Sequence, residues 1–195
     1  NVALADGRHL DLRLAAGAIL EVAPAGMLGG DDWTGWLLLP GLAEPHAHID
    51  KALTAEVIPN PSGDLMGAIE AWQAAAPSLS VSDMQERAVA AIERYVVHGA
   101  TTIRTHVNVG GAVGVKALQA VRAARETAGG VADVEIVALI GFPLTGIDGA
   151  NNRAALEEAL EIGFDVMGGV PSIDPDPEGH LALVLDTAAQ HDMAV

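Results

Sequence analysis

The regular spacing of its strand-like segments constrains the fold of this chain more than any other feature. Short apolar segments begin near residues 101, 134, 165 and 194, so they recur every 29 to 33 residues. The stretches between them carry apolar residues at helical spacing and end at or near glycine, as helices commonly do. A strand, a crossover helix and the return to a parallel strand need about 30 residues. The sequence therefore predicts a parallel sheet with helical connections.

Such a sheet can be closed, as in a (β/α)₈ (TIM) barrel, or open, as in a doubly wound sheet, and the pattern is compatible with both. No Gly-x-Gly-x-x-Gly fingerprint follows any strand, and the glycines of residues 110–114 form an ordinary turn more readily than a phosphate cradle. Polar residues on one side of the first two strands favour a barrel interior. We predict an α/β fold of the TIM-barrel type in which residues 40–195 supply only the N-terminal half.

The segment before this half-barrel has a different pattern. Residues 1–39 contain short strand-like pieces separated by the turn signals Asp6-Gly7, Ala16-Gly17 and Gly29-Gly30. They predict a separate β-rich unit. The apolar run of residues 36–42 is predicted to be a buried strand that leads into the barrel.

Two helix starts can be proposed from capping residues. Ser82, followed three residues later by Gln85, has the pattern of a capping box. Asp176-Pro177 places a capping side chain before a proline that suits the first helical position.

Composition excludes several classes of function. The formal net charge of −16 argues against nucleic-acid binding, which needs clustered Lys and Arg. Without cysteine the chain can form neither disulfides nor thiolate metal sites. No apolar run approaches the roughly 20 residues that span a bilayer, and no signal pattern opens the sequence. We expect a cytoplasmic protein that binds neither nucleic acid nor membrane.

The sequence Glu44-Pro45-His46-Ala47-His48 carries the strongest chemical signal. In a strand, residues two apart point to the same face, so His46 and His48 are predicted to lie side by side. Two neutral imidazoles can bind one divalent ion, but catalytic zinc usually takes three protein ligands and a water. Spacing alone therefore leaves a chance pair of histidines as an alternative.

Four motifs occur in order along nearly the whole chain. They are Pro-His-Ala-His-Ile-Asp at 45–50, Arg-Thr-His-Val at 104–107, Gly-Phe-Pro at 141–143 and Gly-Gly-Val-Pro-Ser-Ile-Asp at 168–174. This set resembles the amidohydrolase superfamily, and within it the cytosine deaminase group. The resemblance implies the N-terminal portion of a metal-dependent (β/α)₈ barrel, preceded by part of a composite β-sandwich. It also implies hydrolytic deamination of a small heterocycle.

The resemblance makes His46 and His48 ligands of one divalent metal ion, zinc or iron. The fourth barrel strand ends without the lysine that would bridge two metals, which agrees with a single ion. The family's third metal histidine, its glutamate acid/base, a further histidine and an aspartate would all lie beyond Val195. The catalytic residues are therefore unknown from this sequence.

For substrate binding, the resemblance points to Leu65, His106, Phe142 and Leu144. Leu65 matches the position that packs against the ring, and His106 ends the second barrel strand, although a structural histidine is an equal alternative. Leu144 stands where cytosine deaminases carry the glutamine that reads the pyrimidine amide. Leucine forms no side-chain hydrogen bond, so a ring other than cytosine is expected.

Several supporting roles are hypotheses from the same pattern. Asp50 and Lys51 would orient the histidine pair, while Asn108 replaces an aspartate of the family. Glu44 and Arg104 are expected to form a buried ion pair inside the barrel. The helical histidines are expected to be solvated; they are His98, His180 and His191.

Alternatives to cytosine-like deamination remain open at this point. One is an amidohydrolase acting on a substituted triazine or a cyclic amide through the same metal chemistry. Another, of a different class, is a non-catalytic half-barrel that acts as a scaffold. The implied partners are a small heterocyclic substrate and the C-terminal half of the barrel, on the same or a separate chain. A homo-oligomer is also left open.

Overall fold

The computed structural model describes residues 1–195 and contains two compact units, Asn1–Gly41 and Leu42–Val195. The first unit is a four-stranded sheet in the order β3-β2-β1-β4. β1 pairs antiparallel with β2 and parallel with β4, and β2 pairs antiparallel with β3. The bounds are β1 Val2–Leu4, β2 His9–Ala15, β3 Ala18–Pro24 and β4 Leu37–Leu38.

The apolar run of residues 36–42 is not the predicted buried strand. Trp36 is 63% exposed and Leu37 is 54% exposed. The run divides at Pro40-Gly41, because proline has no N–H to donate to a sheet ladder. The strand that enters the second unit begins only at Leu42.

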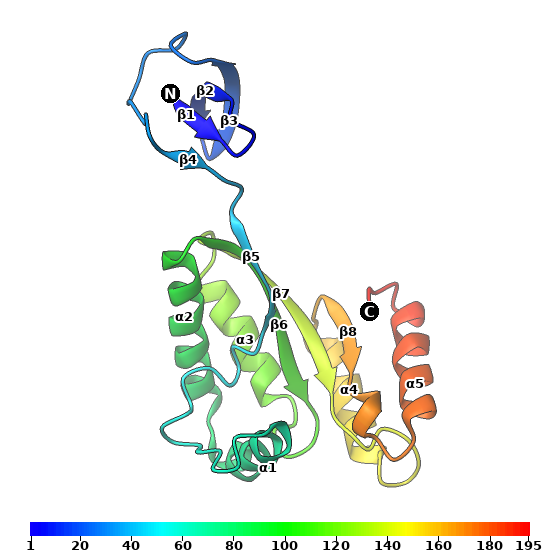
Figure 1. Ribbon diagram of the computed structural model, residues 1–195. Coiled ribbons are helices and arrows are strands. Elements are labelled where there is room, and N and C mark those ends of the chain that lie inside the picture. Colours follow the sequence, from blue (N-terminus) through cyan, green and yellow to red (C-terminus); the bar gives the residue numbers. More distant parts are fainter. The chain divides into compact units, whose positions relative to one another are not determined.

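The second unit is built on a parallel sheet in the order β5-β6-β7-β8 (Figure 1). Ala194 forms a parallel bridge to Val166 of β8, at the position predicted for the start of a further strand. The predicted α/β class with helical crossovers is confirmed. The bounds are β5 Leu42–Ala47, β6 Ala100–Val109, β7 Asp133–Ile140 and β8 Val166–Gly169.

Figure 1 shows the helices of the second unit beside these strands. Two short 3₁₀ helices, Ala76–Ser78 and Pro171–Ile173, follow α1 and β8. The α-helices are α1 Leu65–Ala75, α2 Val81–Val97, α3 Lys116–Thr127, α4 Ala150–Ile162 and α5 Pro177–Gln190.

Strand β6 shows how the sheet separates its two faces. Ile103, Thr105 and Val107 are buried, whereas Thr102 and Arg104 of the opposite face are exposed. The buried face packs on helices whose inward residues are largely alanine, valine and leucine. Small apolar side chains let helices approach a parallel sheet closely, so this face forms the core. The polar residues of the other face remain available for chemistry.

Helix starts depend on which residue caps the first turn. The N-cap of α2 is Ser80, whose hydroxyl accepts the Asp83 N–H at 3.1 Å. The predicted capping box at Ser82 is therefore wrong, because Ser82 already lies in the first turn and its hydroxyl donates to Glu86. At α5, Asp176 caps the helix by accepting the Gly179 N–H, as predicted.

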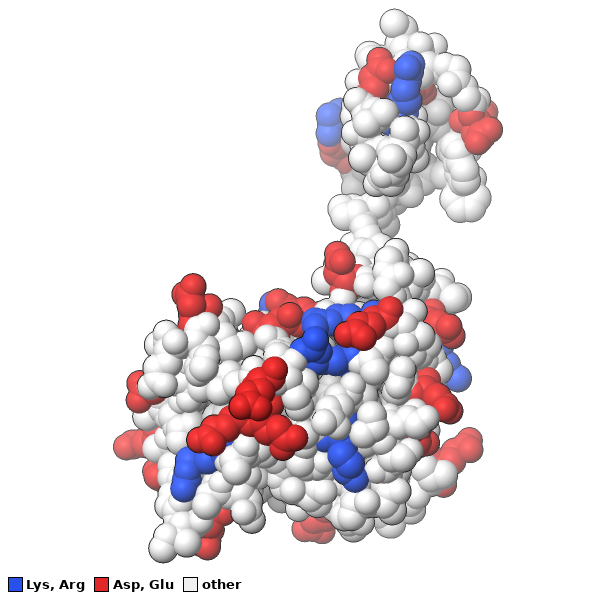
Figure 2. Space-filling view, turned by 180° about the vertical axis from the view of Figure 1, so that it is seen from behind, with Lys and Arg blue, Asp and Glu red and all other residues white.

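Acidic side chains are spread over the face of the second unit drawn in Figure 2, and basic side chains lie next to them. This distribution follows the formal net charge of −16. No helix has both the length and the apolar composition needed to cross a membrane.

Candidate active site

Three imidazoles gather where β5 and β6 end. The His46 and His48 ring centroids are 5.3 Å apart, and the ring of His106 lies 4.1 Å from that of His46 in a nearly parallel stack. The His48 and His106 centroids are separated by 5.7 Å. Alternation along β5 places the first two rings next to each other, and the parallel neighbour β6 brings in the third. The arrangement concentrates ring nitrogens at the carboxyl end of the sheet.

The tautomer of His48 follows from its hydrogen-bond partner. Its Nδ1 lies 2.8 Å from the carbonyl oxygen of His106, and a carbonyl can only accept. Nδ1 therefore carries the proton, and the Nε2 lone pair is free. Burial, reinforced by the nearby charge of Lys51, lowers the pKa of His48. Both effects favour a neutral ring that can bind a cation.

The pKa of His106 is lowered as well. Burial, and then the proximity of His46, lowers the pKa of His106. Its Nδ1 is buried and has no hydrogen-bond partner. The ring therefore keeps an unused polar atom beside the histidine pair.

Asp50 and Lys51 tie the segment after β5 to the end of β6. The Lys51 ammonium donates to the Asp50 carboxylate at 3.0 Å and to Asn108 Oδ1 at 2.9 Å. Asp50, whose side chain is fully buried, also accepts the Asn108 N–H. Thr105 Oγ1 accepts the Ile49 N–H at 3.1 Å. These bonds fix the backbone that carries His48.

A cavity of about 390 Å³ lies over the ends of β6, β7 and β8 and against α1. Its wall is mainly apolar, with Lys51 positioned over the ring of Trp72 at 5.5 Å from the centroid. A largely apolar cleft with a few polar groups is typical of small-molecule sites. The residues that face it from different segments include His48, Lys51, Leu65, Ile69, Trp72, Asn108, Phe142, Val170 and Ile173.

The predicted substrate residues are placed unequally around this cavity. Leu65 and Phe142 lie in its wall, together with His48. His106 stacks on His46 and does not line the cavity. The side chain of Leu144 is fully buried, and its N–H donates to Asp174.

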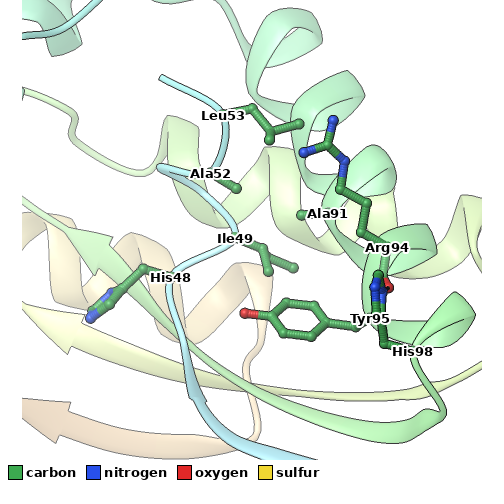
Figure 3. Close-up of a pocket in the computed structure, with 8 residues that line it drawn as sticks. All are labelled: His48, Ile49, Ala52, Leu53, Ala91, Arg94, Tyr95 and His98. Atoms are coloured by element: carbon green, nitrogen blue, oxygen red, sulfur yellow. Dashed lines mark hydrogen bonds between the residues drawn. The ribbon is translucent and has the colours of Figure 1, made fainter. Parts of the chain in front are cut away.

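A second cavity, also of about 390 Å³, lies between α2 and the segment after β5 (Figure 3). Ile49, Arg94, Tyr95 and His98 are among its lining residues. Figure 3 shows the His48 ring directed away from the other labelled side chains. The free ring nitrogen is thus not presented to this cavity, and the cavity over β6–β8 is the candidate substrate site.

Two expectations about charged and polar residues are wrong. Arg104 pairs with Glu135, its direct neighbour across β6 and β7, and not with Glu44. Glu44 lies opposite Ile103, and its carboxylate accepts the His46 N–H at 2.9 Å. The ion pair is also partly exposed and not buried.

His180 is fully buried and not solvated. Its Nδ1 lies 2.8 Å from Asp174, and this pair satisfies it without water. The expectation does hold for His98 and His191, which are exposed.

The donor chemistry of the histidine pair fits part of a metal site. The free Nε2 of His48 and the adjacent, exposed His46 ring offer imidazole nitrogens, a donor type that divalent zinc or iron accepts. No group of three or more His, Cys, Asp or Glu side chains in this chain is arranged to hold a metal ion. The pair thus provides two imidazole donors, fewer than the three protein ligands that catalytic zinc usually takes.

No protein-family model matches the chain. Over its full length it is 27% identical to a pterin deaminase of Rhizobium rhizogenes, of which it covers 43%. Over 84% of its length it is 27% identical to the N-isopropylammelide isopropyl amidohydrolase of Pseudomonas sp. (strain ADP), of which it covers 42%.

A solved structure gives the same result. The 5-methylcytosine deaminase of Klebsiella pneumoniae matches 99% of this chain with a TM-score of 0.84 and 31% sequence identity, and the match covers 49% of that protein. The chain thus spans less than half the length of the relatives it matches. These relatives are hydrolytic enzymes of the amidohydrolase superfamily that act on C–N bonds. The predicted resemblance is confirmed, for the N-terminal portion of such enzymes.

Proposed function

We propose that the protein is a metal-dependent hydrolase that removes an amino or substituted-amino group from a small heterocycle. This chain would form the β-rich segment, as part of a composite β-sandwich, and the first half of a (β/α)₈ barrel. The C-terminal half, on the same or a separate chain, would complete the metal site and supply the acid/base. The observation that carries the proposal is the pair of imidazoles, 5.3 Å apart, beside an apolar cavity at the carboxyl ends of parallel strands.

In this proposal His46 and His48 hold one divalent ion, zinc or iron. When bound, such an ion lowers the pKa of a coordinated water to near ~7 and so provides hydroxide at neutral pH. The His106 carbonyl keeps the proton of His48 on Nδ1 and directs Nε2 outward. Asp50, Lys51 and Asn108 hold the backbone of this ligand in place.

The cavity wall would bind the ring and exclude water from it. Leu65, Trp72 and Phe142 offer apolar and aromatic surface, while Lys51 and Asn108 are polar groups of the same wall. Direct contact of Leu144 with substrate is not proposed, because its side chain is fully buried. A wall with so few hydrogen-bonding groups suits a ring that is more apolar or more substituted than cytosine.

The substrates of the relatives define the panel of rings to test. The natural full-length chain would be assayed for release of ammonia or amine from 5-methylcytosine, pterin and N-isopropylammelide. We expect hydrolysis of at least one ring and a loss of about 100-fold or more in kcat/KM in His48→Ala, since a ligand is removed. His98→Ala changes the exposed histidine that follows α2 as its C-cap and serves as the matched control.

The two other candidate functions are outcomes of the same assay. Hydrolysis of the triazine alone, with no turnover of the pyrimidine or the pterin, would indicate an amidohydrolase of substituted triazines. Absence of all turnover and of bound metal in the full-length chain would contradict the proposal and favour a scaffold.

A further inference from the structure

The buried polar side chains of the second unit share one location. Four of the five lie in the segments that follow the carboxyl ends of the strands, and the fifth, Thr105, lies within β6 on its buried face; each of them connects neighbouring segments. Buried polar groups lower stability unless they are hydrogen-bonded, so their position has a structural reason. The five residues are Asp50, Thr105, Asn152, Asp174 and His180.

These side chains link the loops in order around the sheet. Asp50 and Thr105 join the segment after β5 to β6. Asn152 accepts the Gly111 N–H and donates to the Pro143 carbonyl, both at 2.7 Å, and so joins the loops after β6 and β7. Asp174 and His180 then connect the loops after β7 and β8.

The Asp174–His180 pair makes four hydrogen bonds with both side chains fully buried. Asp174 Oδ2 accepts the Leu144 N–H at 2.9 Å and lies 2.8 Å from His180 Nδ1. Asp174 Oδ1 accepts the Asp176 N–H at 2.8 Å. His180 Nε2 accepts the Val170 N–H at 3.2 Å, so the proton must be on Nδ1. Both ring nitrogens of His180 are therefore satisfied in the neutral state.

The backbone of β8 is shaped to admit this histidine. A Cβ atom on Gly169 would lie 2.4 Å from His180 Nε2, well inside contact distance. Any larger residue at this position would displace the ring or the strand end. The close approach of ring and backbone makes the link between α5 and β8 short and stiff.

The pair touches the candidate substrate cavity only through the backbone. Leu144 lies two residues after Phe142, which is part of one cavity wall. Val170, Ser172 and Ile173 also line the cavity, and they follow β8, the strand that pairs with β7. The hydrogen bonds to Leu144 and Val170 therefore fix the position of two neighbouring segments of the cavity wall relative to each other.

We propose that Asp174 and His180 are positioning residues that determine which ring the cavity accepts, by holding the loop after β7 against the end of β8. The inference rests on the proposed function, because it takes the cavity as the substrate site. The two side chains do not contact the substrate; they fix the part of the cavity wall that the segments after β7 and β8 form.

Amide hydrogen exchange tests the positioning without any need for activity. In the full-length chain, His180→Leu keeps side-chain volume similar but removes both ring nitrogens. We expect exchange of the Leu144 and Val170 amides to accelerate by about tenfold or more. The Val170 N–H loses its acceptor, and the Asp174 carboxylate that accepts from the Leu144 N–H loses the ring that holds it. The matched control is Val134→Ala, a buried change at the amino end of β7, far along the strand from the loop that carries Leu144.

A partial variant separates the two links. His180→Asn retains a donor that can reach Asp174 but loses the acceptor for Val170. We expect the Leu144 amide to stay protected and the Val170 amide to exchange faster. If His180→Leu leaves both amides unchanged, or accelerates exchange over β6 to β8 as uniformly as Val134→Ala does, the positioning role is contradicted.

Ring selectivity tests the second half of the inference. The ratio of dissociation constants for 5-methylcytosine and pterin is measured by calorimetry, which requires no turnover. We expect His180→Leu to shift this ratio by about fivefold or more while Val134→Ala leaves it unchanged, because moving a wall by a methyl-sized gap changes fit. An unchanged ratio, or no ring binding at all, overturns the claim about selectivity. Loss of turnover in the wild type with binding retained would count against the proposed function alone.

Discussion

The carboxyl ends of β5 and β6 and those of β7 and β8 hold their loops with similar hydrogen bonds. The two regions differ in the side-chain nitrogens that they leave without a partner. We call β7 and β8 the sealed end and β5 and β6 the open end. At β7 and β8, Asp174 and His180 are fully buried and each ring nitrogen has a partner. At β5 and β6, His46 is exposed, and His48 keeps a free Nε2. The sealed end can only support neighbouring segments. The open end has unused ligands, and it is there that we place the chemistry.

The distribution of unpartnered polar atoms agrees with this contrast. Two buried side-chain nitrogens lack a hydrogen-bond partner, Trp72 Nε1 and His106 Nδ1. Trp72 lines the candidate substrate cavity, and His106 stacks on His46. Lys51, which follows β5, lies over the Trp72 ring, so both nitrogens are near the open end. A buried polar atom without a hydrogen-bond partner lowers stability, and a ligand that bonds to it would remove this penalty.

The largest effect on stability is expected at the open end, from Lys51→Met. The change leaves the Asp50 carboxylate buried without its cation and should lower the free energy of unfolding by about 3 kcal/mol. Urea denaturation of the full-length chain measures it. The double variant Asp50→Asn/Lys51→Met removes the stranded charge and should recover part of the loss; no recovery would show that the pair is not coupled.

A somewhat smaller effect is expected midway along the edge, from Asn152→Leu. It removes the hydrogen bonds to Gly111 and Pro143, and we expect a loss of about 2 kcal/mol in unfolding free energy. The neighbouring Asn151 is exposed, so Asn151→Leu is the matched control and should change stability by less than about 0.5 kcal/mol. Equal effects of the two substitutions would contradict the bridging role of Asn152.

At the sealed end the expected effect depends on pH. Burial alone would raise the pKa of Asp174, but hydrogen bonds from the Asp176 N–H, His180 and the Leu144 N–H outweigh it and lower the pKa below its usual value. The contribution of Asp174 is therefore present above the usual carboxyl pKa of about 3.9 and is lost as pH falls through the lower folded value. Urea midpoints between pH 6 and 3 should fall less steeply in Asp174→Asn than in the wild type. Parallel curves would count against this assignment.

The smallest effect is expected on the polar face between the two ends. Arg104 and Glu135 are partly exposed, so Arg104→Gln should lower stability by no more than about 1 kcal/mol. The difference should shrink further in high salt, since exposed ion pairs are screened. A loss above about 2 kcal/mol, insensitive to salt, would mean that this face is covered in the full-length protein.

Much of the fold could be predicted from the sequence because local signals repeat. Apolar segments and glycine stops locate β6, β7 and β8 within a few residues. The start of β5 is missed because Pro40-Gly41 divides the apolar run before it. A search for apolar periodicity does not register this break. The cap of α2 is missed because Ser80 and Ser82 are both followed by a polar residue three positions later. Which serine caps the helix depends on where the preceding 3₁₀ helix ends, and the sequence pattern does not show that.

The parts of the candidate site that lie within one segment could be predicted from the sequence. The parts that depend on how neighbouring strands pair could not. The i, i+2 spacing places His46, in β5, and His48, directly after it, next to each other. The partner of Arg104 depends on the register between parallel strands, which no local pattern encodes. Burial of His180 also depends on a distant contact, although Gly168-Gly169 and Asp174 in the same motif were a usable signal for a close approach.

Metal content of the full-length protein tests the central claim most directly. After exposure to zinc and removal of excess, mass spectrometry of the wild type should show about one equivalent of bound metal per chain. His46→Ala should lose it, while His191→Ala, which changes an exposed histidine, should retain it. Equal metal content in wild type and His46→Ala would contradict the assignment of the histidine pair.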